Sequence, residues 1–417
     1  MKHGTVRLSL FGLCVGLYAA IAFGQAKPAP ANAHFVGSKQ CESCHAKTYA
    51  SWKQTRMANV IQDPKLHPEA VLGDFTHPDP ARTFTLDQVA FTYGSRWKQR
   101  YFTLIGDDYY VLPAQWDVAK KKWLPYHVAD GTDWWTAHYP SDNMQRPTGP
   151  LCDGCHSVNY NIATKKVTEW NVGCEKCHGP GSEHVAHPTK TNIVNPARLD
   201  VVRATDTCIQ CHSQGQPKNN PIPSGSGSSS VAKYYDWPVD YLPGQRLADT
   251  WTFEDHKLGD TSFYHFADGT ARKNRMQGND YTQALMAHRD VRCSDCHNVH
   301  SAENPSNLIT QGNDLCVDCH MHHVVPGPGV TQTIAEHTHH AAKSPASQCT
   351  ACHMPKIEVT IPGNFVSAHT FKFISPKMTQ QFNMPNACNK CHQDKDAAWS
   401  LKQLATWQTV SPWSVLQ

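Results

Sequence analysis

One short pattern, C-x-x-C-H, occurs eight times in this chain of 417 residues and constrains its fold more than any other feature. The occurrences, numbered motif one to motif eight in chain order, lie at 41–45, 152–156, 174–178, 208–212, 293–297, 316–320, 349–353 and 388–392. They take up sixteen of the 17 cysteines. A cysteine-rich exported chain would first suggest disulfides. Here a histidine follows every cysteine pair, which is the signature of covalent haem attachment.

Each motif supplies the three groups that a c-type haem needs. Two thiols three positions apart add to the two vinyl groups on one porphyrin edge, and the next residue binds the iron from one face. A single C-x-x-C pair is also compatible with a zinc site or a redox dithiol, but eight pairs that all carry the histidine predict eight covalently bound haem c groups. The predicted attachment residues are Cys41, Cys44, Cys152, Cys155, Cys174, Cys177, Cys208, Cys211, Cys293, Cys296, Cys316, Cys319, Cys349, Cys352, Cys388 and Cys391. The predicted proximal iron ligands are His45, His156, His178, His212, His297, His320, His353 and His392.

The first 24 residues have the pattern of a signal peptide. Lys2 and Arg7 give a basic start, an apolar run covers 8–23, and small residues at 22–24 offer a cleavage site. The alternative is an uncleaved membrane anchor, but the run is short for a spanning helix, which needs about 20 apolar residues. We predict that 1–24 is removed, that the mature chain has no transmembrane span, and that it is periplasmic or extracellular.

The spacing of the motifs divides the chain into two similar halves. The intervals of 22 and 34 residues from motif two to motif four nearly repeat as 23 and 33 from motif five to motif seven. A segment rich in glycine, serine and proline lies between them at 217–230 and predicts a flexible linker. We therefore predict an N-terminal tetrahaem module at 25–216 and a C-terminal tetrahaem module at 231–417. Because only 40% of the residues are hydrophobic, the haems must supply much of the core, and the expected fold is mainly α with much irregular structure.

The long interval between motifs one and two predicts a small antiparallel β insert near residues 84–125. Three runs there, TFTLDQVAFTYG, QRYFTLIG and DDYYVLPAQWDV, are rich in aromatic and β-branched residues. Gly94, Gly106 and Pro113 interrupt them. The insert either covers the first haem as a structural element or forms a docking face or part of a substrate pocket.

Histidines outside the motifs are more numerous than eight haems can use. Seventeen remain when His3 and the eight motif histidines are set aside. This surplus predicts ligation of most irons by two imidazoles, which keeps the potential low relative to a methionine ligand. Spacing does not decide which histidine binds which iron, and Met57 is an alternative sixth ligand after motif one. The predicted distal ligands are His127, His138, His184, His288, His300, His337, His340 and His369.

Several segments resemble a known family. FVGSKQCESCHAKTYASWKQTRMA and NVGCEKCHGPGSEH are similar to multihaem cytochromes related to the tetrahaem electron carrier of ammonia oxidisers. HRDVRCSDCHNVHS, LCVDCH, QCTACHMP and NACNKCHQDKDAAW resemble the paired C-x-x-C-H cytochromes. The resemblance covers most of 35–400 and is specific for a multihaem cytochrome. It implies stacked and perpendicular haem pairs, ligation by two histidines, and His184, His300 and His369 as ligands.

Two kinds of function follow from this reading. Eight haems in so short a chain must lie close together, which predicts electron transfer along them. The expected partners are other redox proteins, multihaem cytochromes or extracellular acceptors. Self-assembly of several copies into a larger multihaem assembly is one form that this electron transfer could take. The alternative is a reductase or oxidoreductase of small nitrogen or sulfur compounds with one open haem, although the C-x-x-C-K motif of multihaem nitrite reductases is absent from the sequence. A formal charge of +3, which falls to +1 with loss of the signal peptide, and the lack of a basic cluster in the sequence give no indication of nucleic-acid binding. A sensor or scaffold would need a signalling module, and the sequence contains no recognisable one.

Overall fold

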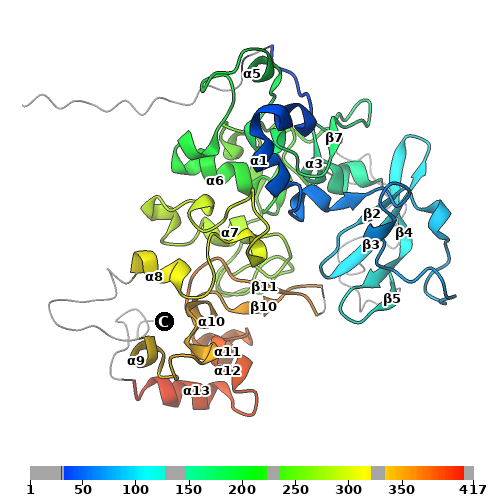
Figure 1. Cartoon of the computed structure of the whole chain (residues 1–417). Helices are drawn as coiled ribbons and strands as arrows, with labels where there is room; N and C mark the ends of the chain where they lie inside the picture. Colours follow the sequence, from blue (N-terminus) through cyan, green and yellow to red (C-terminus); the bar gives the residue numbers. More distant parts are fainter. Residues whose placement is uncertain are drawn as a thin grey trace, which may run out of the picture.

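The computed structural model describes residues 30, 32–126, 147–222, 234–320, 334–361 and 363–407. The predicted signal peptide, His127 and His138 lie outside these residues, as does most of the predicted linker. Short helices follow one another along the described chain (Figure 1). They are α1 (Glu42–Trp52), α3 (Gly154–His156), α4 (Glu175–His178), α5 (Ser182–Ala186), α6 (Val201–Ile209), α7 (Gln277–Tyr281), α8 (Asp314–His320), α9 (Ile334–Thr338), α10 (Cys349–His353), α11 (Pro376–Phe382), α12 (Ala387–Cys391) and α13 (Ala397–Leu404).

The strands of the described chain form one five-stranded antiparallel sheet and three two-stranded ribbons. The sheet has the order β1 (Ile61–Gln62), β2 (Phe91–Tyr93), β3 (Lys98–Ile105), β4 (Asp108–Asp117) and β5 (Lys122–Pro125). The ribbons pair β6 (Ser157–Val158) with β7 (Glu169–Trp170), β8 (Gly215–Pro217) with β9 (Trp251–Phe253), and β10 (Lys356–Glu358) with β11 (Phe365–Ser367). The predicted fold, mainly helical and irregular with a small antiparallel insert, is confirmed.

The five-stranded sheet has a core of its own made of aromatic side chains. Phe84, Tyr101 and Trp123 pack together with their rings 5.1–5.9 Å apart. The Trp123 indole also donates a hydrogen bond to the Asp74 carbonyl at 2.9 Å. The sheet differs from the prediction at its start, because Leu86–Gln88 forms a 3-10 turn closed by a capping box from Thr85 instead of a strand. A capping box satisfies the free N–H groups of a turn and so competes with strand pairing.

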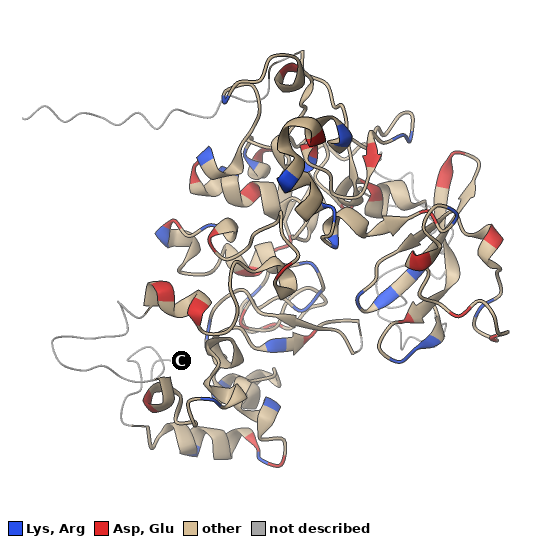
Figure 2. Cartoon of the chain, viewed as in Figure 1, with Lys and Arg blue, Asp and Glu red and all other residues tan. Residues whose placement is uncertain are grey.

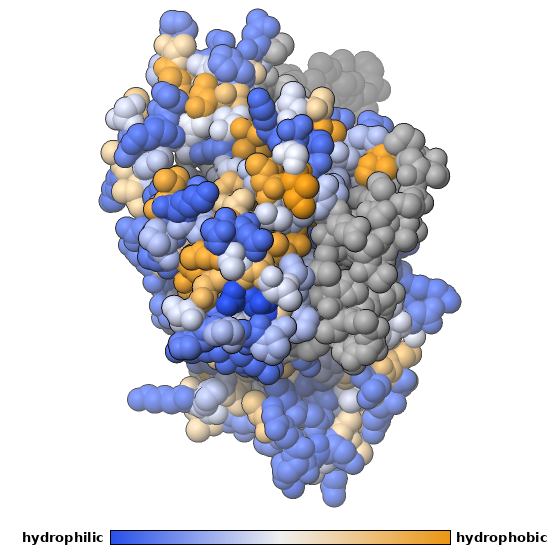
Figure 3. Space-filling view, turned by 90° about the vertical axis from the view of Figure 1, so that its right-hand side faces the viewer, coloured by the Kyte–Doolittle hydropathy of each residue, from blue (hydrophilic) through white to orange (hydrophobic). Residues whose placement is uncertain are grey.

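The helical part runs as a column from motif one to motif eight, and the sheet projects from its side (Figure 1). Lysine and arginine are interspersed with aspartate and glutamate along the described ribbon in Figure 2. Figure 3, which looks onto the side that carries the sheet, shows apolar residues in small groups among hydrophilic ones. No helix among the described residues combines the length and apolar character required to cross a bilayer.

Several contacts join the two predicted modules. Strand β8 ends at the first residue of the predicted linker and pairs with β9 beyond it, with Gly215 opposite Phe253. Arg292, next to motif five, donates hydrogen bonds to the carbonyls of Ala197 and Leu199, which precede motif four. The division into two modules stays a prediction, and these contacts make the described halves one packed structure.

Candidate haem-binding site

Most motifs are folded as a single helical turn. Helices α4, α8 and α10 each end at the motif histidine. Residues three apart lie on the same face of a helix, so both cysteines of a motif point toward one porphyrin edge. Motif one lies at the start of α1, where His45 leaves the helical conformation with φ −115° and ψ 36°. The ends of α4, α8 and α10 thus coincide with the motif spacing, since two cysteines three positions apart need one helical turn.

A single continuous cavity of about 1620 Å³ runs between the motifs. Residues from motifs one to seven line it, and the cavity connects the top of the column to motif seven. Pockets for one small ligand usually measure about 300–1,000 Å³, so this volume suits several large planar groups in sequence. The cavity fits the predicted haems better than any single substrate.

Five pairs of imidazoles face one another along the column of motifs. Each pair joins a motif histidine to a histidine outside the motifs, and the ring planes lie within 15–38° of parallel. The pairs and their centroid separations are His45 with His184 at 6.4 Å, His178 with His300 at 6.1 Å, His297 with His369 at 6.5 Å, His353 with His337 at 6.3 Å, and His392 with His340 at 6.2 Å.

The spacing matches two imidazoles bound to one metal from opposite faces. A metal–imidazole bond is about 2 Å long, so two rings in line across one metal have centroids on the order of 6 Å apart. Rings in direct contact lie closer, as His339 and Trp407 do at 4.3 Å. The structure thus brings five predicted distal histidines into the position that bis-histidine ligation requires, while ligation itself stays a prediction.

Hydrogen bonds to the second ring nitrogen orient these imidazoles. Nδ1 of His178 lies 2.7 Å from the Val194 carbonyl, and Nδ1 of His297 lies 3.0 Å from the Ser306 carbonyl. Among the distal histidines, Nδ1 of His369 lies 2.8 Å from the carbonyl of Ser367. A carbonyl can only accept, so Nδ1 carries the proton in each case. Nε2 is then left with a free lone pair for a metal, which is the usual arrangement of a ligating histidine.

Burial keeps several of these imidazoles neutral. It lowers the pKa of His300, and it lowers the pKa of His369 to about 4, although the hydrogen bond that His369 donates to the Ser367 carbonyl opposes this shift. Burial also lowers the pKa of His178, although the hydrogen bond to Val194 opposes this shift. A histidine binds metal only in its neutral form, so the packing prepares these residues for ligation.

Thiols from different motifs meet in the interior. Because each thiol marks the porphyrin edge that it would hold, these contacts give the order of the predicted haems in space. The thiols that lie near one another are Cys41 and Cys174, Cys155 and Cys211, Cys208 and Cys293, and Cys316 and Cys349. They connect motif one to three, two to four, four to five, and six to seven.

Hydrogen bonds and helix contacts link further motifs. The side-chain amide of Gln210, in motif four, donates a hydrogen bond to the Lys176 carbonyl of motif three at 3.1 Å. Helices α10 and α12, which carry motifs seven and eight, are in contact, and motifs five and six line the same cavity. The motifs therefore form a row in the order one, three, four, five, six, seven and eight, with motif two beside motifs three and four.

The remaining predicted ligands are not brought into pairs by the described residues. His156, His212 and His320 have no facing imidazole within the part of the chain that the structure describes. His288 lies exposed in a 3-10 turn, and no imidazole contact is described for it. Met57 lines the cavity near motif one. The predicted roles of all these residues stay predictions.

Two buried carboxylates that sequence reasoning missed support the site. Glu175, inside motif three, is 2% exposed and accepts hydrogen bonds from Val36, Gly37 and Gly181. It thereby ties the segment before motif one to the loop that leads to His184. A carboxylate within C-E-K-C-H was visible in the sequence, but nothing there marked it as buried.

The second missed carboxylate is Asp280 in α7. It is 3% exposed and accepts hydrogen bonds from the backbone N–H groups of His369 and Ala271, at 2.8 and 2.7 Å. These two bonds fix the backbone that carries the distal imidazole opposite His297. Only the tertiary fold brings Asp280 to His369, so no local pattern signalled it.

Comparisons with known proteins agree with this geometry. The family described as cytochrome c554 and c-prime matches residues 40–87, and the family described as a doubled CXXCH motif matches residues 286–324. No curated protein sequence matches the chain.

Solved structures of multihaem cytochromes are also similar. The outer cell wall cytochrome OcwA superposes with a TM-score of 0.68 at 22% sequence identity, over 90% of this chain and 87% of that one. An undecahaem cytochrome from the S-layer of Carboxydothermus ferrireducens gives a TM-score of 0.49 at 17% identity, over 90% of this chain and 61% of that one. The similarity to OcwA shows a shared fold.

Proposed function

We propose that the chain is a multihaem c-type cytochrome that carries electrons along a continuous row of eight haems, most of them held between two imidazoles. Haem iron supplies reversible one-electron chemistry when bound. The motif cysteines would hold each porphyrin, and the motif histidines would bind each iron from one face. The residues His184, His300, His337, His340 and His369 would bind five of the irons from the other face.

The observation that carries this proposal is the set of five facing imidazole pairs. An iron with two imidazole ligands has no site for a substrate, so it can exchange electrons but cannot bind small molecules. The thiol contacts add that neighbouring porphyrin edges would lie next to each other. Electron tunnelling falls steeply with distance, so adjacent edges favour rapid transfer along the row.

The partners and location extend the proposal beyond the molecule itself. Motifs one and eight lie at opposite ends of the column (Figure 1), so electrons would enter near one end and leave near the other. We propose export by the signal peptide to the periplasm or cell surface, with other redox proteins, multihaem cytochromes or extracellular acceptors as partners. The name of OcwA describes an outer cell wall cytochrome, which supports an exported role.

The haem content and spin state of the exported protein test this function. Mass analysis and the pyridine haemochrome assay should give eight haems per chain. Electron paramagnetic resonance of the oxidised protein should show predominantly low-spin iron. A protein with free thiols, or one in which most irons are high-spin, would overturn the proposal.

A second candidate is a reductase of small nitrogen or sulfur compounds. It is favoured by His156, His212 and His320, for which the described residues provide no facing imidazole. A distinct high-spin fraction together with turnover of nitrite, hydroxylamine or sulfite by the reduced protein would establish it. Low-spin spectra and no turnover would favour the carrier.

A further inference from the structure

Motif two is the most deeply packed motif, and cationic side chains surround it. Cys155 is 3% exposed, and Gly154 lies so close to the Trp237 indole that a Cβ there would come within 1.9 Å of the ring. Lys176, from motif three, donates a hydrogen bond to the Gly154 carbonyl. Arg275 approaches from the C-terminal half, with Nη1 3.6 Å from Cys155 Sγ.

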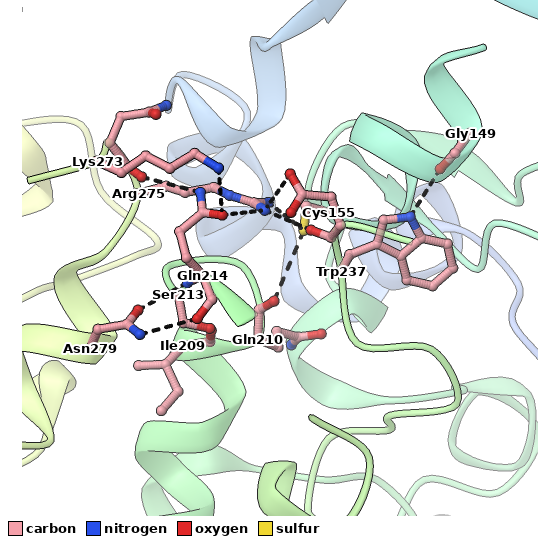
Figure 4. Close-up of polar contacts among 12 residues, drawn as sticks. Gly149, Cys155, Ile209, Gln210, Ser213, Gln214, Trp237, Lys273, Arg275 and Asn279 are labelled. Atoms are coloured by element: carbon pink, nitrogen blue, oxygen red, sulfur yellow. Dashed lines mark hydrogen bonds and ion pairs between the residues drawn. The ribbon is translucent and has the colours of Figure 1, made fainter. Parts of the chain in front are cut away.

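Arg275 is held in place by a set of polar contacts (Figure 4). Its Nη2 lies 2.9 Å from the Asp236 carboxylate and 2.6 Å from the Asp236 carbonyl. The same nitrogen lies 3.4 Å from the Gln214 side-chain oxygen. The backbone of Arg275 has a φ of 55°, in the left-handed region that side-chain-bearing residues rarely adopt. Such a conformation persists only where surrounding contacts impose it.

A second buried cation fixes the Gln214 amide. Lys273 is 4% exposed and donates to the Gln214 oxygen at 3.0 Å. Asn279 accepts from the Gln214 backbone N–H at 2.9 Å and donates to its carbonyl at 3.1 Å. The position of the Arg275 guanidinium is therefore determined by residues from both halves of the chain.

The guanidinium lies next to two haem-attachment edges at once. Cys155 of motif two is in contact with Cys211 of motif four. Arg275, His156 and His212 line the same cavity. Motif two joins the row beside motifs three and four, so Arg275 lies at this junction.

We propose that Arg275, opposed by Asp236, sets the reduction potentials of the haems on motifs two and four and makes motif two a site where electrons reside. A fixed positive charge favours the ferrous over the ferric state, and charge and hydrogen bonding near a haem are established means of tuning its potential. With haems bound at Cys155 and Cys211, transfer of one electron from the motif-four haem to the motif-two haem would oxidise the first and reduce the second, with no proton or other reactant. This inference rests on the proposed haem attachment.

Redox titration of the whole, haem-loaded protein with optical detection tests the assignment. Arg275→Gln should move the part of the curve contributed by two haems to more negative potential. Asp236→Asn should move it to more positive potential, because it removes the opposing charge and keeps the backbone carbonyl that binds Arg275. Arg275→Lys should titrate as the wild type. Arg272→Gln is the matched control, since Arg272 donates to the Ser262 carbonyl at 2.9 Å and does not line the cavity.

The opposite signs distinguish tuning from a structural role. A packing defect would move both variants in the same direction, and that result would overturn the inference, as would an unchanged curve for Arg275→Gln. If Arg275→Gln fails to assemble, Asp236→Asn against wild type still decides the sign. A haemochrome count separates the two proposals. If Arg275→Gln holds eight haems and its titration curve does not shift, only the tuning role is excluded. If the wild type lacks haems, the proposed function itself is excluded.

Discussion

The five-stranded sheet and the column of motifs are stabilised in different ways. In the sheet, Tyr101, Trp116 and Trp123 form a closed aromatic core with exposures of 0–9%. In the column, the motifs surround a cavity of about 1620 Å³, and the apolar clusters are small and separate. One chain thus contains a region that can bury its own side chains and a region whose interior is reserved for cofactors.

This difference indicates which region of the fold depends on haem. Burial of apolar surface stabilises a protein roughly in proportion to the area removed from water. The sheet obtains that area from its own residues, whereas the column would obtain it from porphyrin faces. Attachment of haem is then part of folding in the column and independent of folding in the sheet.

The largest expected effect comes from producing the chain without haem attachment. The column should lose its cooperative structure, whereas the sheet at 61–125 should keep its aromatic core. Limited proteolysis followed by mass spectrometry should recover a resistant fragment from the sheet and rapid cleavage across 147–222 and 234–407. The haem-loaded protein is the control. If the sheet and the column of the haem-free chain resist proteolysis equally, folding of the column does not depend on haem more than folding of the sheet does.

Truncation of the sheet core should have the next largest effect. Trp123→Ala removes an indole that is 5% exposed, and substitutions of this kind cost about 3–5 kcal/mol. Chemical denaturation followed by a sheet-specific readout, such as hydrogen exchange, should show local loss with an unchanged haem spectrum. Leu104→Ala is the control, because Leu104 is 51% exposed and should change stability by no more than about 0.5 kcal/mol. Loss of haem from Trp123→Ala would show that the two regions fold together.

Removal of one distal imidazole should affect one haem and leave the sheet intact. His300→Ala should convert the haem on motif three from low-spin to high-spin, one of eight in the predicted complement. Electron paramagnetic resonance measures the fraction. His67→Ala is the comparison variant, since the exposed His67 side chain contacts Glu69 and does not line the cavity. An unaltered spectrum for His300→Ala would exclude the His178–His300 pair as ligands.

The smallest expected effect is a pH dependence within the sheet. Burial alone would raise the pKa of Asp117, but hydrogen bonds from Lys98 and Lys120 outweigh it and leave the pKa below its ordinary value. The Lys98 ammonium lies 2.6 Å from this carboxylate. Because the folded pKa is depressed, the stabilisation is fully present above the unfolded pKa of about 3.9 and is lost as the pH falls through the lower folded value.

Thermal unfolding of the sheet between pH 6 and pH 3 measures this contribution. Asp117→Asn should flatten the decline relative to wild type. Asp260→Asn, which removes an exposed ion pair with Lys257, should leave the profile unchanged. Parallel declines in wild type and Asp117→Asn would show that the pair contributes nothing.

The sequence allowed much of the site to be predicted because the chemistry is local. Two cysteines and a histidine within one turn identify each attachment point without any knowledge of the fold. Among the distal ligands, His300 and His184 lie close to a motif along the chain, yet each faces a different motif, His178 and His45 respectively. Proximity in sequence therefore picked out residues that the structure pairs with motif histidines, but it gave no information about which motif each one faces.

The rest depends on contacts between distant segments. The burial of Glu175 and Asp280 and the position of Arg275 beside Cys155 arise only when the chain has folded. The sheet was recognised from its aromatic and β-branched runs, but its short first strand at 61–62 has too few residues to form a pattern. Local signals thus identify elements and ligand types, and tertiary packing decides pairing.

The proposed ligation also has a consequence for biogenesis. The second ligand of motif one comes after motif three, that of motif three follows motif five, and that of motif five comes just before motif eight. The porphyrin joined to motif three would keep a vacant coordination position until the trailing half, which carries His300, has crossed the membrane. A translocation intermediate would then bind carbon monoxide or cyanide at an iron whose sixth position is occupied by histidine in the folded protein. The amount of carbon monoxide or cyanide bound during secretion would therefore report how far maturation has advanced.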